Sequence, residues 1–159
     1  MPYTVNSVVE KYTRPLQDGR VSIKGVTKIH SNPLPILAHI LNFASYERLA
    51  SHFEANGNTK RRCEVVPYSH SAYVLADVTP PGGVFTKKRR FKNRLIWEKE
   101  INNSSETNPN FVVYTADDNR EITEEEQVDM TSTGTAFGYT SAITYLEVIA
   151  PNITKITYF

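Results

Sequence analysis

Basic side chains gather in two short runs, and they are the residues of this sequence best suited to binding a partner. The nine cations are Lys60, Arg61, Arg62, Lys87, Lys88, Arg89, Arg90, Lys92 and Arg94. Lysine and arginine neutralise the phosphates of nucleic acids, and aromatic residues such as Phe91 and Trp97 can stack on unpaired bases. The sequence therefore predicts a nucleic-acid-binding surface without base-specific readout. A solubilising or nuclear-localisation-like run, or one that contacts a neighbouring subunit, is the alternative.

Charge is unevenly distributed along the chain, although the formal net charge is only +1. Residues 60–99 carry ten Lys or Arg against three Asp or Glu, and residues 100–159 carry two against ten. We expect either two opposed faces or complementary surfaces on neighbouring copies of the chain. Two solvated loops are the alternative.

No catalytic motif stands out. The sequence has no Gly-x-Gly-x-x-Gly, Walker, Gly-x-Ser-x-Gly or His-Glu-x-x-His pattern. Its four histidines lack metal-ligand spacing, and its single cysteine, Cys63, has no identifiable partner base. Asp117 and Asp118 offer oxygen ligands to Ca²⁺, but their spacing matches no known loop and favours a solvated acidic segment. We therefore expect no enzyme and no cofactor, with Ca²⁺ at these two aspartates as the alternative.

Short strands must position these residues. Alternating apolar and polar residues, bounded by Gly, Pro and Asn, predict strands over 21–29, 63–68, 72–79, 111–115, 140–149 and 153–159. Ser45 as N-cap and Gly57 just past the end predict a helix from residue 45 to residue 53. The apolar run 36–41 is ambiguous, and the two prolines at its entry favour a strand.

Length and composition indicate one domain over residues 1–159, with 1–19 as an extended arm. A hydrophobic content of 40% suits a globular domain, and plentiful Thr, Val, Ile and Tyr suit a β-rich one. No apolar run approaches the roughly 20 residues that a membrane helix needs. One cysteine cannot form an internal disulfide, so the fold does not depend on an oxidising compartment.

Residues 34–83 resemble part of the single jelly-roll capsid (coat) proteins of small icosahedral viruses. The resemblance follows five segments in order: 37–41, the helix at 46–53, the Pro-containing strand 63–68, the hairpin partner ending at Pro80–Gly83, and the late strand 145–151. It implies an all-β antiparallel sandwich of jelly-roll type with one or two short helices. Frequent turns and short alternating strands favour the same class.

The resemblance also implies what the protein does. It implies a viral structural protein that self-assembles into a capsid shell around nucleic acid, without enzyme activity. Its partners would be other copies of itself and genomic nucleic acid, with no membrane, in the virion and in the host cytoplasm during assembly. Residues 1–9 lack the basic arm common in such proteins, which weakens RNA binding more than the fold. The alternative is a monomeric β-sandwich nucleic-acid-binding accessory protein of the movement or silencing type, which sizing would distinguish.

Overall fold

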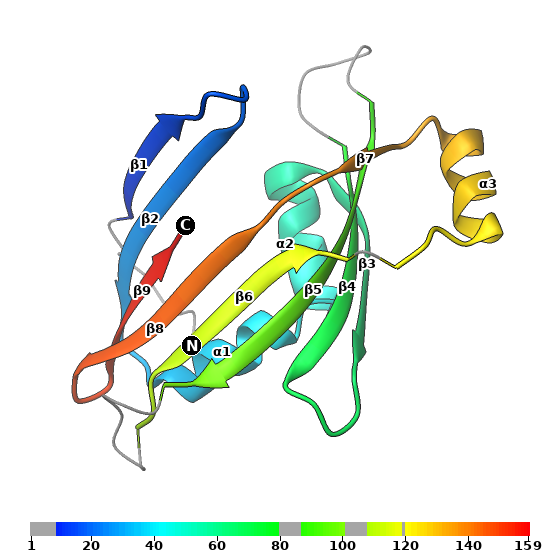
Figure 1. The fold of residues 1–159 in the computed structure, drawn as a ribbon. Coiled ribbons are helices and arrows are strands. Elements are labelled where there is room, and N and C mark those ends of the chain that lie inside the picture. Colours follow the sequence, from blue (N-terminus) through cyan, green and yellow to red (C-terminus); the bar gives the residue numbers. More distant parts are fainter. Residues whose placement is uncertain (1–8, 80–86, 101–107, 119) are drawn as a thin grey trace. The chain divides into compact units, whose positions relative to one another are not determined.

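The computed structural model describes residues 9–79, 87–100, 108–118 and 120–159 (Figure 1). The strands within these residues are β1 (Glu10–Pro15), β2 (Val21–Ile29), β3 (Asn58–Val65), β4 (Ser71–Val78), β5 (Arg89–Lys99), β6 (Phe111–Asp117), β7 (Ala136–Gly138), β8 (Ala142–Ala150) and β9 (Ile153–Tyr158). The helices are α1 (Pro33–Leu41), α2 (Tyr46–Asn56) and α3 (Glu124–Thr133). The Pro80–Gly83 turn and the first eight residues of the expected arm lie outside the described residues.

Hydrogen bonds join the described strands into one sheet, in the order β1-β2-β9-β8-β6-β5-β4-β3, with β7 beside β5. The pairs β1·β2, β2·β9, β3·β4, β4·β5 and β8·β9 are antiparallel, and β7 runs parallel to β5. The expected jelly-roll sandwich is therefore wrong, because a sandwich needs two sheets packed face to face. The alternating pattern correctly indicated half-buried strands but could not show that helices cover them.

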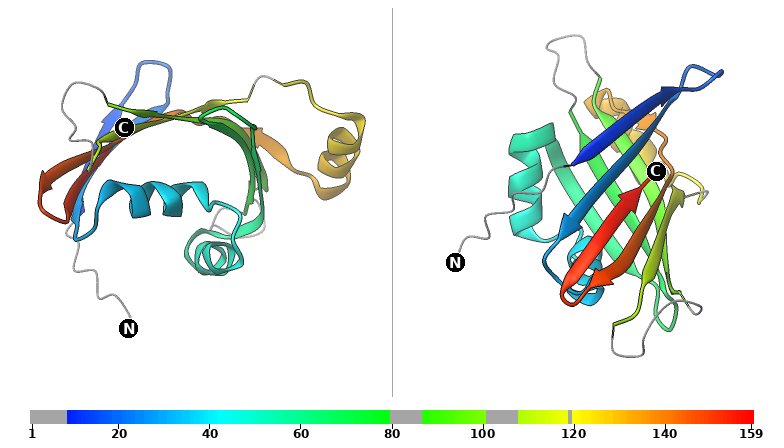
Figure 2. Two further views of the ribbon diagram at one scale, coloured as in Figure 1. Left: turned by 90° about the horizontal axis from the view of Figure 1, so that it is seen from below. Right: turned by 90° about the vertical axis from the view of Figure 1, so that its left-hand side faces the viewer.

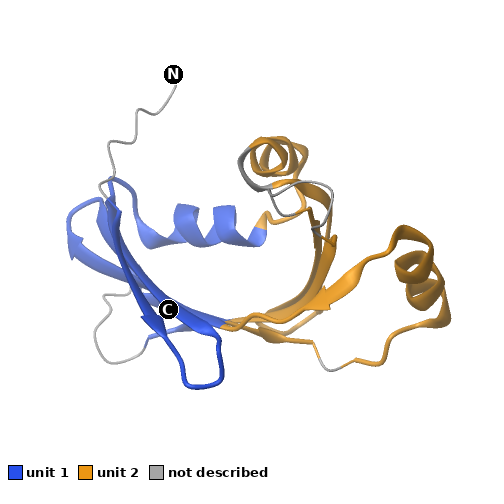
Figure 3. Cartoon of the chain, turned by 90° about the horizontal axis from the view of Figure 1, so that it is seen from above, with its two compact units in different colours: residues 1–41, 97–114, 142–159 blue, residues 42–96, 115–141 orange. Residues whose placement is uncertain are grey.

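The chain divides into two compact units, which are described separately (Figure 3). Unit 1 consists of residues 1–41, 97–114 and 142–159, and unit 2 of residues 42–96 and 115–141. The expectation of one domain over 1–159 stays a prediction. Within the expected arm, β1 is paired with β2 from Glu10 to Pro15.

In unit 1, α1 packs on one face of the strands (Figures 1 and 2). Buried side chains of α1, β6 and β8 form the core with partly buried neighbours: Ile36, Leu37, Phe111, Val113 and Leu146, with Ile29, Ile40, Leu41, Trp97 and Ile156 packed around them. Leu146 is completely buried. This cluster fixes α1 to the sheet.

Segment 36–41 is helical, so the preference for a strand there was wrong. Pro33 opens α1 and Pro35 lies in its first turn, where a missing backbone N–H leaves no helical hydrogen bond unmade. Ile36, Leu37, Ile40 and Leu41 then fall at the 3.6-residue spacing that turns them toward the core.

In unit 2, α2 and α3 lie on opposite sides of strands β3–β5 (Figure 2). The expected helix α2 is confirmed: the Ser45 side chain accepts from the Arg48 N–H, and Gly57 ends the helix at φ 68°. Helix α3 was not expected, because its residues were interpreted as a solvated acidic segment. Its start carries a capping box, in which Thr123 and Glu126 bond to each other's backbone N–H.

Candidate functional site

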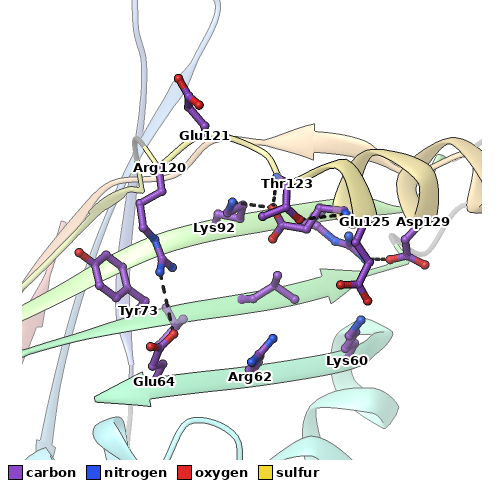
Figure 4. A pocket seen from close by; sticks show the side chains of 14 residues that line it. Lys60, Arg62, Glu64, Tyr73, Lys92, Arg120, Glu121, Thr123, Glu125 and Asp129 are labelled. Atoms are coloured by element: carbon purple, nitrogen blue, oxygen red, sulfur yellow. Dashed lines mark hydrogen bonds and ion pairs between the residues drawn. The ribbon is translucent and has the colours of Figure 1, made fainter. Parts of the chain in front are cut away.

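A pocket of about 480 Å³ opens in unit 2 between strands β3–β5 and the segment that contains α3 (Figure 4). Its lining combines cations and carboxylates: Lys60, Arg62, Glu64, Tyr73, Val74, Leu75, Arg90, Lys92, Arg120, Glu121, Thr123, Glu125, Glu126 and Asp129. The volume is within the range of small-ligand sites, but the polar lining differs from the mostly apolar lining typical of them.

Strand alternation decides which cations face the pocket. Successive side chains of a strand point to opposite faces, so Lys60 and Arg62 of β3 share the pocket side. Arg61 points the other way, toward α2. There its guanidinium lies 4.3 Å from the centre of the Phe43 ring and donates from Nη1 to the Phe43 carbonyl at 3.2 Å. The basic triplet is therefore divided between two faces of the sheet.

Arg90 lies at the floor of the pocket between two aspartates. Its Nε and Nη2 donate to the Asp77 carboxylate at 2.7 and 2.8 Å, and Nη2 also donates to Asp129 of α3 at 2.6 Å. The Arg90 and Asp77 side chains are each only 3% exposed. The hydrogen bond to Asp77, opposed by burial and reinforced by Asp129, raises the pKa of Arg90 above its usual value. Arg90 thus links Asp77, its cross-strand neighbour on β4, to Asp129 on α3.

A second ion pair ties the start of α3 to β5. Lys92 Nζ donates to Glu126 Oε2 at 2.9 Å, with the two side chains 10% and 23% exposed. The same Glu126 oxygen accepts from the Thr123 N–H at 3.1 Å. The capping residue of α3 is therefore also its anchor to the sheet.

The loop before α3 is held by Arg120. Its guanidinium stacks on the ring of Tyr73, 3.6 Å from the ring centre, and its Nε donates to Asp118 at 2.7 Å. A longer contact of 3.9 Å joins Arg120 to Glu64 of β3. These contacts lie at the end of the pocket away from Asp129 (Figure 4).

These ion pairs account for part of the charge asymmetry. The basic segment and the acidic segment meet within one chain, where Arg90 binds Asp129 and Lys92 binds Glu126. No neighbouring copy is needed to neutralise them. The expectation that complementary surfaces on separate copies explain the asymmetry is therefore withdrawn.

The structure brings four of the nine predicted binding residues together. Lys60, Arg62, Arg90 and Lys92 line the pocket, and two of these are already paired with carboxylates. The other five lie outside the lining: Arg61 on the α2 side, Lys87, Lys88 and Arg89 around the start of β5, and Arg94 exposed, 5.8 Å from the Tyr73 ring centre. Binding at these residues stays a prediction.

Sequence reasoning missed the acidic half of the site. Thr123-Glu-Glu-Glu126 has the Ser/Thr-x-x-Glu spacing of a capping box, which predicts a helix start. Nothing comparable could reveal Asp129 as the partner of Arg90, because the two residues are 39 positions apart. The stacking of Arg120 on Tyr73 likewise depends on the fold.

The other candidate chemistry gives little support to a catalytic or metal site. Burial raises the pKa of the Cys63 thiol, which lowers its nucleophilic fraction. Asp117 accepts a hydrogen bond from the Thr140 N–H, and Asp118 accepts two from Arg120. Among the described residues, no three His, Cys, Asp or Glu side chains converge as metal ligands. The expectations of no enzyme and no cofactor, and the Ca²⁺ alternative, stay predictions.

A second surface lies in unit 1, on the face of the strands that carries α1. Ile29 packs against the α1 cluster, and alternation places Ile23 and Val21 of β2 on the same face. These two side chains are 38% and 59% exposed. Between them and the cluster, the Tyr158 ring lies over Gly25, where a Cβ atom would collide with it. An apolar strip therefore continues past the part of the face that α1 covers.

Acid is expected to release α3 from the sheet. Hydrogen bonding to Arg90 lowers the pKa of Asp129 despite some burial, and the charges of Arg90, Lys60 and Lys88 add to it. Partial burial raises the pKa of Glu126, but Lys92, the Thr123 N–H and Arg90 together lower it. Depressed carboxyl pKa values stabilise the docked state above the ordinary pKa, and this stabilisation is lost as pH falls through the folded-state values.

The measurement is the NMR amide shifts of residues 123–133 during a pH titration. We expect them to move toward values of an undocked segment below about pH 4, near the ordinary carboxyl pKa range. The amides of β8 should keep their positions over the same range. If the α3 shifts change only when β8 also unfolds, the ion pairs do not hold α3.

Comparisons with known proteins were made for sequence and for structure. No protein-family model matches the sequence, and no curated protein matches it significantly. Within the described residues, no helix combines the length and apolarity needed to cross a membrane. The information therefore comes from solved structures.

Two of the similar structures are named as a lipid transfer protein and a lipid transfer domain, and a third is human STARD10. A STAR-related lipid transfer protein from Xanthomonas axonopodis matches with a TM-score of 0.67 and 10% identity, covering 94% of this chain and 73% of that one. The human StarD13 (DLC2) lipid transfer and protein localization domain matches at 0.62 and 9%, covering 94% and 67%. Human STARD10 matches at 0.63 and 11%, covering 96% of this chain and only 58% of that one.

These matches overturn the resemblance to viral capsid proteins. The identification as a jelly-roll coat protein was wrong, and with it the assembly into an icosahedral virion shell around nucleic acid. The alternative of a β-sandwich nucleic-acid-binding accessory protein is wrong as well, since the described strands form one sheet and the fold is that of lipid transfer domains. The partners expected from a capsid, a large homo-oligomer and a genome, and the virion and host-cytoplasm localisation lose their basis. At about one residue in ten identical, the likeness shows that the chain has the fold of STAR-related lipid transfer domains.

Proposed function

We propose that this protein binds a lipid, or another small molecule with an apolar body, against the α1-bearing face of unit 1. The observation that supports this most directly is the fold, which solved lipid transfer proteins share over 94% of this chain. We also propose that it acts by binding and not by catalysis, in line with the absence of a catalytic motif in the sequence.

The exposed apolar strip of β2 is the part of unit 1 suited to such a ligand. Val21 and Ile23 lie in the row that begins at Ile29, which Thr27 and the Tyr158 ring over Gly25 interrupt. A ligand lying along the strand would contact the two exposed aliphatic side chains beyond that ring. Burying an exposed aliphatic side chain stabilises a complex by about 1.5–3 kcal/mol when burial is complete. A half-exposed isoleucine therefore has enough apolar surface to affect binding measurably.

Ile23→Ser is expected to weaken lipid binding, and Ile143→Ser supplies a matched control. The two isoleucines are 38% and 36% exposed. Ile143 pairs with Phe159 through the backbone, one residue away from the Thr144–Tyr158 pair, and so lies on the opposite face. We expect roughly three- to sevenfold weaker binding for Ile23→Ser, because a ligand can bury only the exposed 38% of that side chain. Ile143→Ser should stay within about twofold of the parent chain by the same reasoning.

The single tryptophan provides the measurement. Trp97 packs against the core cluster of unit 1, so energy transfer from Trp97 to a dansyl-labelled phospholipid reports binding in that unit. Unlabelled lipid should compete the signal away. An absence of transfer, or equal losses for the two isoleucine variants, would count against binding at this face.

A further inference from the structure

Two ion pairs and one buried apolar side chain hold α3 in place. Met130 is the buried side chain of α3, while Val128 is 69% exposed. The ion pairs join Asp129 to Arg90 and Glu126 to Lys92. Because these are charge-assisted contacts, other anions can compete with the two carboxylates for their cations.

The cations under α3 form a surface of their own. Lys60 and Arg62 line the open pocket and make no ion pair within 4.0 Å in the part of the chain that the structure describes. With α3 lifted away, Arg90 would keep Asp77 as its partner. Lys60, Arg62 and Lys92 would then face solvent together, with Asp77 held by Arg90 and Glu64 as the nearby carboxylates of β3 and β4.

The two docking carboxylates indicate which ligand this surface suits. Asp129 and Glu126 stand three residues apart on one helix face and present two negative charges to neighbouring strand positions. A phosphate group carries nearly the same charge on three strong acceptor oxygens. Arginine and lysine bind such groups through charge-assisted hydrogen bonds. The pocket beside α3, about 480 Å³, leaves room for a ligand of this size.

We propose that the pocket face of β3–β5 binds a phosphate-bearing ligand, and that α3 covers this face as a releasable acidic mimic of the ligand. Lys60 and Arg62 receive the phosphate first, at the open wall of the pocket. The ligand then displaces Glu126 from Lys92 and Asp129 from Arg90. This site is in unit 2 and does not depend on lipid binding by unit 1.

Hydrogen–deuterium exchange of α3 in the full chain tests the proposal. Inorganic pyrophosphate is compared with sodium chloride at matched ionic strength, because salt alone also weakens ion pairs. We expect pyrophosphate to speed exchange of residues 124–133 about fivefold beyond sodium chloride, as loss of partly buried charge-assisted bonds predicts. If the amides of α3 exchange equally fast in the two salts, the ligand is not a soluble phosphate compound.

A second arm distinguishes a lipid headgroup from a free phosphate. The chain is mixed with phosphatidylcholine vesicles with and without phosphatidic acid, and exchange of α3 and co-sedimentation are measured. Faster exchange with phosphatidic acid alone assigns the site to a membrane headgroup, and a response to pyrophosphate alone assigns it to a soluble ligand. The absence of an effect in both arms overturns the proposal.

Matched variants separate ligand binding from a purely structural role. Glu126→Gln keeps the capping hydrogen bond, which glutamine also makes, but removes the competing charge. We expect it to raise the affinity for pyrophosphate about fivefold, because it frees Lys92 from a charge-assisted bond. Glu124→Gln removes the same charge from an α3 residue outside the pocket lining and should change the affinity less than about twofold, as an exposed charge predicts. An unchanged affinity in Glu126→Gln contradicts the mimic.

Replacing Lys60 and Arg62 with serine tests the entry side of the site. Both residues are exposed on β3, so the fold should survive, and circular dichroism checks that it does. Affinity for the responding probe is expected to fall about thirtyfold, which corresponds to roughly 1 kcal/mol for each of the two cations removed. An affinity equal to that of the parent chain would remove these residues from the site.

Discussion

Replacing Asp77 with alanine is expected to lower the free energy of unfolding by about 3–5 kcal/mol, the cost of breaking a buried ion pair from one side. The carboxylate accepts two hydrogen bonds from Arg90, and both side chains are only 3% exposed. Without Asp77, the Arg90 guanidinium stays buried with only Asp129 beside it, whose side chain is 42% exposed. Asp77→Asn should show most of the same loss, since it keeps the shape and removes the charge. Urea unfolding followed by circular dichroism measures both.

The exposed pair of Glu147 and Lys155 is the matched control. Its Nζ–Oε2 distance is 2.9 Å, close to that of the buried pair, but the side chains are 41% and 37% exposed. Glu147→Ala should therefore cost less than about 1 kcal/mol, as is typical of surface ion pairs. Similar losses for Asp77→Ala and Glu147→Ala would show that the burial of Arg90 does not matter to stability.

Gly57→Ala is the second substitution with a large expected effect. Gly57 ends α2 at φ 68°, where an L side chain costs about 1–2 kcal/mol. A Cβ atom there would also collide with the carbonyl oxygen of Thr79. The backbone of Thr79 is held in place because its N–H donates to the Gly57 carbonyl at 2.9 Å. Moving that backbone should add roughly 1–3 kcal/mol, the usual range for overpacking.

Gly134→Ala isolates the conformational part of this cost. Gly134 ends α3 at φ 63°, and an added Cβ would meet no atom within 4 Å. Its loss should therefore be only the 1–2 kcal/mol or so of the left-handed conformation. Urea unfolding of the two variants gives the comparison, and equal losses would mean that the Thr79 carbonyl moves away freely.

Local sequence signals predicted the elements whose ends are marked by caps and clear alternation. Strand β2 spans the predicted residues 21–29, and α2 has the predicted Ser45 and Gly57 caps. Tyr46 and Phe53 of α2 stay 85% and 58% exposed. Alternation could not distinguish a sheet covered by helices from a sheet covered by another sheet, because both bury one face of each strand. This ambiguity led to the wrong fold class.

The sequence predicted cations of the candidate site but not the carboxylates that pair with them. Clustered cations drew attention to Arg90 and Lys92, which do line the pocket. Their roles could not follow from sequence, because the partners Asp129 and Glu126 come from a helix far along the chain. Arg61 was predicted with the site but does not line the pocket. It neighbours Lys60 and Arg62 in sequence, yet strand alternation places its side chain on the other face of the sheet.

The strand order leaves β3 at one end of the sheet among the described residues. A terminal strand exposes backbone N–H and C=O groups that invite strand addition from another chain, and lysine or other charged side chains discourage it. Lys60, Arg61 and Arg62 stand in the middle of β3. Because like charges on two approaching edges repel, this triplet also disfavours edge-to-edge pairing between copies of the chain, whatever else its residues bind.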